Sequence, residues 1–337
     1  MSVNTERRIL STSTLNAGSR AEALRGSLLG LALGDALGFV VEAQPPEIAR
    51  EYVADYLCGG RAGERAHPGF GFGQYSDDTQ LARELLLSVR DAGDWDPSRF
   101  AARVASLIFA GRDVGAGPGT RSSGMRLVLG APWRQAGMPA PYAGNGSAMR
   151  AGPVGLLFGG ELERWGRCVR EQSRVTHQDP RCTAGALAIA GAVALASARG
   201  PIHAADLVGQ LADYVASEDR PMAEAIRDLA LWVGLEPEPA ARRLGVVETG
   251  VSPFVVPSVL WSLYAFLRNP DDYWNAVATA IAVGGDTDTM AAMTGAIAGA
   301  RLGTASLPDR LLDRLTDRGT WGAVELAQLA HDCADIA

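Results

Sequence analysis

Apolar residues recur at three- and four-residue spacing along most of the chain, which is the pattern of helices with one buried face. The spacing is clear in TQLARELLLSVRDAG, which follows Asp78, and in TMAAMTGAIAGARLG, which follows Asp288. Only FVVE at 39–42 and GVVETGV at 245–251 resemble strands. We therefore expect an all-α protein, with helices predicted over 21–38, 79–92, 97–111, 120–130, 147–158, 161–175, 181–199, 203–217, 221–233, 254–268, 271–283, 288–302, 307–316 and 321–336.

The predicted helices show no internal break, so we expect one compact domain over 21–337 after a polar, flexible tail at 1–20. Several helices are rich in Gly and Ala, which allows their axes to approach closely. The connecting loops at 59–75, 112–120, 131–147 and 284–287 are rich in Gly and Pro. Such backbones can take positive φ angles and come near a ligand, and sites commonly lie on loops held by a rigid scaffold.

The charge of the chain disfavours some functions. The net charge of −7 and the lack of a basic run argue against a nucleic-acid-binding surface. All 31 basic residues are Arg, and the absence of Lys excludes Schiff-base chemistry, pyridoxal phosphate enzymes and a Walker A lysine.

Cysteine usage and hydropathy limit the class of protein further. The four cysteines (Cys58, Cys168, Cys182 and Cys333) are too widely spaced to suggest a zinc site or a disulfide framework. No signal-peptide core precedes the first predicted helix, and polar or glycine positions interrupt every apolar segment. We expect a soluble, cytoplasmic protein that does not associate with membranes.

Two glycine-preceded turns each place two carboxylates and two hydroxyls at a predicted helix start: Ser76-Asp77-Asp78-Thr79 and Asp286-Thr287-Asp288-Thr289. A helix N-cap needs one oxygen acceptor, and capping would account for either turn taken singly. Each turn carries more acids than capping requires, and this excess occurs at both turns, which suggests a bound cation. Hard oxygen ligands favour Mg²⁺, Mn²⁺ or Ca²⁺ over zinc or copper. If both turns meet in one pocket, they suit a two-metal centre.

Two further acids lie in LRGSLLGLALGDALGFVVEA, at Asp35 and Glu42. Seven residues apart, they would share a face if the helix continued that far. Asp35 is most simply interpreted as a solvated or capping acid. Glu42 directly follows the apolar run FVV, and a carboxylate beside buried residues needs a partner or a raised pKa. Glu42 is therefore the better catalytic candidate.

Five segments of the chain together resemble the ADP-ribosylglycohydrolase family. They are GSLLGLALGDALGFVVEA, YSDDTQLA, GNGSAMRAGPVGLLF, THQDPRCTAGALA and VGGDTDTMAAMTGAIAGA, in the family's order from about residue 24 to 302. The resemblance implies an all-helical fold with a cleft for two Mg²⁺ or Mn²⁺ ions. By position in the matching motifs, the implied metal ligands are Ser76, Asp77, Asp78, Asp286, Asp288 and Thr289. Ser76 stands where many relatives have Thr, and either hydroxyl can coordinate a metal.

The resemblance also assigns a substrate side. Glu42 falls on the position of the family's mobile glutamate, near the reacting ribose. The loops GRDVGAGPGT (111–120) and GNGSAMR (144–150) present backbone N–H groups that can cradle a diphosphate, although plain glycine turns explain the first loop equally well. His177 could be an ordinary loop histidine or a contact of the bound ribose or phosphates. The predicted substrate-binding residues are Gly115, Gly117, Asn145, Gly146, Ser147, Met149 and His177.

The expected reaction is hydrolysis of the glycosidic bond between ADP-ribose and an acceptor, by a water activated by two Mg²⁺ or Mn²⁺ ions. The predicted catalytic residues are Glu42, Asp78 and Asp286, and geometry has to decide which acid is the base. The expected partner is an ADP-ribosylated protein, with ADP-ribose as product. One alternative is a dinuclear phosphohydrolase; another is a non-catalytic ADP-ribose-binding relative, which the retained aspartates disfavour. The acceptor linkage stays open.

Overall fold

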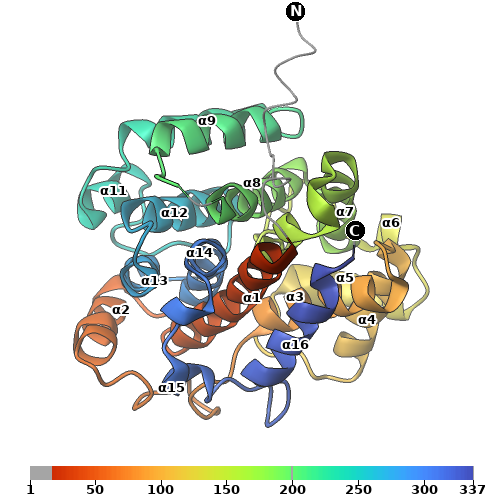
Figure 1. Cartoon of the computed structure of the whole chain (residues 1–337), viewed down its shortest axis with the longest axis horizontal. Coiled ribbons are helices and arrows are strands. Elements are labelled where there is room, and N and C mark those ends of the chain that lie inside the picture. Colours follow the sequence, from red (N-terminus) through yellow and green to blue (C-terminus); the bar gives the residue numbers. More distant parts are fainter. Residues whose placement is uncertain (1–16, 199, 337) are drawn as a thin grey trace, which may run out of the picture.

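The computed structural model describes residues 17–198 and 200–336, which form a single all-helical domain (Figure 1). Between these described residues only isolated β-bridges occur, with no strand, so the predicted all-α class is confirmed. The main helices are α1 (Ala17–Phe39), α2 (Pro46–Tyr52), α3 (Asp77–Ala92), α4 (Pro97–Phe109), α5 (Pro118–Val128), α6 (Trp133–Ala136), α7 (Leu162–Thr176), α8 (Pro180–Ser197), α9 (Ala204–Val215), α10 (Arg220–Asp228), α11 (Pro237–Arg243), α12 (Val255–Arg268), α13 (Tyr273–Ala282), α14 (Thr287–Leu302), α15 (Asp309–Leu312) and α16 (Ala323–Ala334).

Helices α1 and α14 lie side by side at the centre of the molecule (Figure 1). Four glycines spaced by four residues form the contact edge of α1: Gly26, Gly30, Gly34 and Gly38. A Cβ atom added at Gly30 would lie 2.3 Å from the carbonyl oxygen of Gly295, which is closer than real Cβ atoms approach. The two backbones are therefore in direct contact, and this contact fixes how α1 meets the first turn of α14.

Other helices enclose this central pair. The Gly- and Ala-rich α8 packs against α14, and α12 and α13 cover another side. Tyr273 at the start of α13 donates a hydrogen bond from its hydroxyl to the carbonyl of Gly30, at 2.7 Å. Among the described helices, α8 alone is long and apolar enough to cross a membrane by length and composition, and it is largely buried inside the fold.

The predicted helix over 147–158 is wrong. The chain there makes turns followed by a short 3₁₀ segment, Gly152–Leu156. Pro153 has no N–H to donate to a helical hydrogen bond, which disfavours a continuous α-helix at this point. Gly155 packs so tightly on α8 that an added Cβ would lie 2.1 Å from the carbonyl oxygen of Ala190. The glycines of this segment therefore serve close packing of an irregular backbone.

Three short helices, α2, α6 and α11, were not predicted from the apolar spacing. Helices α2 and α11 each begin with a proline in the first turn and span only seven residues, and α6 spans four, so all three are too short for the spacing to repeat. A π-helical turn, Val53–Cys58, continues α2. The predicted helix over 307–316 is helical only at α15, and the one over 221–233 ends as α10 at Asp228 before a 3₁₀ turn.

Neither strand-like run is a strand. Residues 39–42 contain the end of α1 and the turn after it, and 245–251 is a turn region whose single bridge joins Val251 to Gly285. Residues 1–16 of the tail predicted over 1–20 lie outside the described residues. Helix α1 begins at Ala17, so the last four residues of that predicted tail are helical.

Candidate active site

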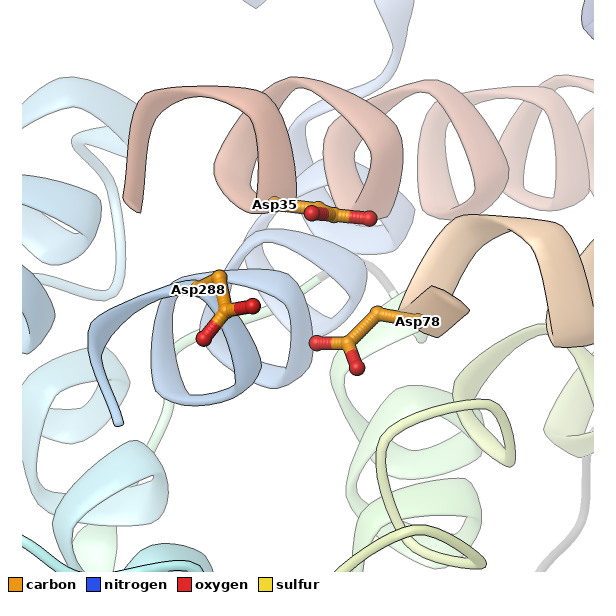
Figure 2. A group of neighbouring side chains, drawn as sticks. All are labelled: Asp35, Asp78 and Asp288. Atoms are coloured by element: carbon orange, nitrogen blue, oxygen red, sulfur yellow. The ribbon is translucent and has the colours of Figure 1, made fainter. Parts of the chain in front are cut away.

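Acids from three helices meet beside the contact of α1 with α14. Asp35 of α1, Asp78 of α3 and Asp288 of α14 point toward one another (Figure 2), with carboxylate oxygens within 4.8 Å of each other. Glu42, Asp286 and Asp288 form a second such group. The two acidic turns of the sequence therefore converge. We call Asp35, Glu42, Asp77, Asp78, Asp286 and Asp288 the acid cluster.

Asp35 links α1 to the start of α3. Its carboxylate accepts hydrogen bonds from the backbone N–H groups of Ser76 and Thr79, at 2.8 Å and 3.0 Å, and from the Thr79 hydroxyl. The Ser76 hydroxyl is the local N-cap and accepts from the N–H of Asp78. Asp35 is thus a capping acid that acts from another helix. It is fully buried rather than solvated, and sequence spacing gave no sign that it joins the cluster.

A glycine pair holds the start of α14 against the turn that carries Glu42. The N–H of Ala43 donates to the carbonyl of Gly285, and the N–H of Asp286 donates to the carbonyl of Val251. Gly285 has φ +82°, and an added Cβ would lie 2.1 Å from the Val251 oxygen. Only glycine fits there. The predicted loop at 284–287 therefore sets the relative position of Glu42 and Asp286.

No arginine of the described residues forms an ion pair with the acid cluster, and Arg150 interacts with Asp77 only at longer range. Three buried carboxylate oxygens have no hydrogen-bond partner: Asp77 Oδ2, Asp78 Oδ2 and Asp288 Oδ1. Burial, and then the neighbouring acids, raise the pKa of all three side chains well above the usual value. Buried unpaired carboxylates are costly, and a cation would satisfy them.

The chemistry of these ligands fits hard divalent cations. Unpaired carboxylate oxygens and hydroxyls are the donors that Mg²⁺ and Mn²⁺ prefer. The Thr289 hydroxyl lies 3.4 Å from Asp78 Oδ1, so it faces the first acidic turn from the second. Ser76 is fully buried and its hydroxyl already accepts the N–H of Asp78, at 3.2 Å, as an N-cap. The remaining lone pair of Ser76 is all that it could offer a metal.

Glu42 differs from the other acids because it is partly exposed and lies in a turn. Burial, then Asp286 and Asp35, raise its pKa to about 7. Asp35 has a pKa raised to about 6 by burial, against the hydrogen bonds from Thr79 and Ser76. Asp286 also has a raised pKa because of burial, opposed by the side-chain hydrogen bond from Asn145.

The acid cluster opens into a cleft of about 110 Å³. The far wall is formed by the first turn of α5 and by the loop 142–149. Six of the predicted substrate-binding residues line it: Gly115, Gly117, Asn145, Gly146, Met149 and His177. A larger cavity of about 610 Å³ lies near α11, and none of the acid cluster reaches it. Because the acid cluster lines the smaller cleft, we place the candidate site there.

Two predicted substrate residues are engaged within the protein. Ser147 does not line the cleft, and its buried hydroxyl donates to the carbonyl of Cys182 at 3.0 Å. Asn145 lines the cleft, but its side-chain amide donates to Asp286 Oδ2 and to the Ser258 hydroxyl. Asn145 therefore orients an acid of the cluster, whatever else it contacts.

The wall at 112–117 is anchored to the first acidic turn. The N–H of Val114 donates to Gln80 Oε1 and its carbonyl accepts from the N–H of Asp77. Gly115 follows with φ +77°, and a Cβ added there would lie 3.9 Å from Asp77 Oδ1. Six other lining residues were not among the predicted ones: Pro118, Gly119, Thr120, Tyr142, Gly144 and Pro253. Four of them belong to the two loops predicted to cradle a diphosphate. Tyr142 and Pro253 lie in irregular segments without periodicity or charge, so no local signal marks them.

The chain is similar to known proteins along most of its length. The sequence profile of ADP-ribosylglycohydrolase matches residues 16–336. An ADP-ribosyl-(dinitrogen reductase) glycohydrolase of Rhodospirillum rubrum is 30% identical, over 86% of this chain and 89% of the relative. The ADP-ribosylhydrolase ARH3 of Xenopus tropicalis is 28% identical, over 84% and 88%.

A solved structure described as an ADP-ribosylglycohydrolase-related protein complex superposes with a TM-score of 0.71 at 26% identity, covering 95% of this chain and 99% of that one. The family consists of hydrolases that act on ADP-ribose linkages. Because the profile spans nearly the whole length, the chain belongs to the ADP-ribosylglycohydrolase family.

Proposed function

We propose that this chain is a metal-dependent hydrolase that cleaves the glycosidic bond between ADP-ribose and an acceptor, releasing ADP-ribose. The observation that carries the proposal is the convergence of two acidic turns, with three unpaired buried carboxylate oxygens, on a glycine-lined cleft. A protein that only packs helices has no use for such a costly arrangement. Membership of the family supplies the reaction class.

The two turns would hold the cations from opposite sides. Ser76, Asp77 and Asp78 would contribute from α3, and Asp286, Asp288 and Thr289 from α14. Two bound divalent cations lower the pKa of a water molecule and hold substrate hydroxyls in place. We favour Mg²⁺ or Mn²⁺ because the available ligands are oxygens.

Asn145 and Glu42 have separate roles beside the proposed metal ligands. Asn145 fixes the Asp286 carboxylate in one orientation through its amide. Glu42 is hydrogen-bonded to no other described residue through its side chain, so its carboxyl group is free to contact a ligand in the cleft. We assign Glu42 to the chemical step, where it orients the ribose or moves a proton at the anomeric centre. The transition state has oxocarbenium character, as in other glycoside cleavage.

The glycine-lined wall suits the diphosphate. Gly115 and Gly117 bring backbone close to the cleft at the start of α5, where N–H groups and the helix dipole favour an anion. Gly146 does the same from the opposite loop. We propose an ADP-ribosylated protein as the substrate, since the Rhodospirillum rubrum relative is named as a glycohydrolase of ADP-ribosyl-(dinitrogen reductase), which is a protein.

A substrate panel tests the proposal. The purified chain is incubated with ADP-ribosylated peptides linked through arginine or serine, with ADP-ribosylated nucleic acid and with small ADP-ribosyl conjugates. Release of free ADP-ribose is measured with Mg²⁺, with Mn²⁺ and with EDTA. We expect release from at least one linkage, abolished by EDTA. Inorganic phosphate in place of ADP-ribose would identify the phosphohydrolase alternative, and binding without release would identify a non-catalytic relative.

A further inference from the structure

A buried guanidinium lies directly behind the cleft. Arg150 is fully buried, and no carboxylate in the described part of the chain pairs with it. Four of its five N–H donors bind neutral acceptors instead: the carbonyl of Gly146 at 2.6 Å, the side chain and carbonyl of Gln172, and the Thr176 hydroxyl at 2.8 Å. Arg150 therefore fixes the loop at Gly146 and the end of α7 against each other.

The Thr176 hydroxyl stands between Arg150 and His177. Its oxygen accepts from Arg150 Nη2, because a guanidinium can only donate. Its oxygen also lies 2.8 Å from Nδ1 of His177. Thr176 is fully buried, so the hydroxyl hydrogen needs an acceptor, and Nδ1 is the one within reach. A hydrogen on Nδ1 would leave the hydroxyl hydrogen without an acceptor, so the proton of the ring belongs on Nε2.

We propose that Arg150 and Thr176 hold His177 in the tautomer that carries its proton on Nε2, so that the ring presents a hydrogen-bond donor to the cleft. His177 lines the cleft, and Nε2 has no acceptor among the residues that the structure describes. Gly144 and Gly146 leave room around this edge: a Cβ at Gly146 would lie 2.8 Å from His177 Cε1. The donor is therefore available to a ligand.

The charge state agrees with this geometry. Burial, and then the charge of Arg150, lower the pKa of His177 to about 3. The ring of Tyr142 faces His177, with 5.8 Å between the two ring centroids. Burial raises the pKa of the nearby Cys182 thiol to about 12, so that thiol is neutral. None of these neighbouring groups is a carboxylate. The ring stays neutral over the physiological range and donates from one fixed atom.

This inference rests on the proposed function for its ligand: an oxygen or ring nitrogen of the ADP-ribose group that accepts a hydrogen bond from Nε2. A buried donor fixed in advance discriminates strongly against a ligand that lacks the acceptor. Thr176 and Arg150 do not touch the ligand. They are positioning residues that act through His177.

The first test is nitrogen NMR of the histidine side chains in the full-length protein with Mg²⁺. The chain has only four histidines, His67, His177, His203 and His331, and the His177→Gln variant assigns the signals of His177. We expect a protonated Nε2 and an unprotonated Nδ1, unchanged from pH 5.5 to pH 8.5. A proton on Nδ1, or a titration in this range, would overturn the inference.

The second test separates Thr176→Val, which removes the hydroxyl, from Thr176→Ser, which keeps it. For Thr176→Val we expect KM for the ADP-ribosylated substrate to rise about three- to tenfold, the size of one net hydrogen bond, with kcat within about twofold. Thr176→Ser should restore KM. Equal KM values in the two variants would contradict the positioning role. If the wild type neither binds nor releases ADP-ribose, the proposed function fails, and the NMR result still decides the tautomer.

Discussion

At the scale of single residues, the acids of the cluster differ from the ordinary helix caps of this chain. Asp96, Asp219 and Asp272 cap α4, α10 and α13, and each accepts the N–H of a residue in the first turn. Asp77 and Asp288 instead keep a buried oxygen without a partner. The same residue type therefore serves two purposes, and the difference lies in what surrounds each carboxylate.

We expect Asp77→Asn and Asp288→Asn each to lower turnover at least about a hundredfold, because an amide oxygen is a weaker metal ligand than a carboxylate. Helical content by circular dichroism should not change, since neither side chain is the cap of its helix. Asp96→Asn is the matched control, because it changes a capping acid outside the cluster. Near-normal rates in both cluster variants would contradict the two-metal assignment.

Glu42→Gln should depress kcat more than it weakens ADP-ribose binding. The change keeps the shape of the side chain and removes the carboxyl group that we assign to the chemical step, where it acts in the transition state. Steady-state kinetics and calorimetry with ADP-ribose separate the two effects. Lost affinity with unchanged kcat would make Glu42 a binding residue only.

At the scale of elements, the glycine edge of α1 places the site. The edge runs from Gly26 to Gly38, and Asp35 lies one residue after its third glycine. Because α1 and α14 touch through their backbones, Asp35 and Asp288 come within ligand distance of one another. The same contact offers no space for a methyl group.

Gly30→Ala should destabilise the fold by about 3 kcal/mol or more, since the new Cβ would lie 2.3 Å from a backbone oxygen that cannot move freely. Gly209→Ala in α9 is the control, because nothing lies within 4 Å of its added Cβ. Alanine is the better helix former there and should leave stability equal or up to about 1 kcal/mol higher. Urea unfolding of both variants measures the difference. Equal midpoints would mean that the two helices are not in backbone contact.

At the scale of the whole molecule, stability should depend on pH and on metal together. Asp35 and Glu42 have folded pKa values of about 6 and about 7, above their usual 3.8 and 4.5. The folded, metal-free protein thus holds protons on these two groups that the unfolded chain releases, so their contribution to stability is fully present below the usual pKa values and is lost as pH rises through this window.

In EDTA, we expect the melting temperature to be a few degrees lower at pH 7.5 than at pH 5.5. Millimolar Mg²⁺ or Mn²⁺ should raise it more at pH 7.5, because the cations bind the ionised carboxylates. A hundredfold excess of metal over its Kd adds about 2.7 kcal/mol per independent site. Asp286→Ala should melt at the same temperature with and without metal. A wild-type melt indifferent to EDTA at both pH values would mean that the acid cluster binds no cation.

The sequence by itself determined the helical class, the two acidic turns and most of the cleft lining. The reason is that a repeated apolar spacing and a pair of acids in one turn can both be recognised within a short stretch of sequence. Helices α2, α6 and α11 are too short for a periodic signal. The segment 147–158 was misread as a helix because the close packing of Gly155 on α8 cannot be recognised from the local sequence.

Tertiary structure alone decided that the two turns converge, that Asp35 joins them from α1, that Ser147 turns away, and that Arg150 and Thr176 lie behind His177. The physical reason is that burial and the distance between residues far apart in the chain are set by how the helices pack, and no local pattern encodes them.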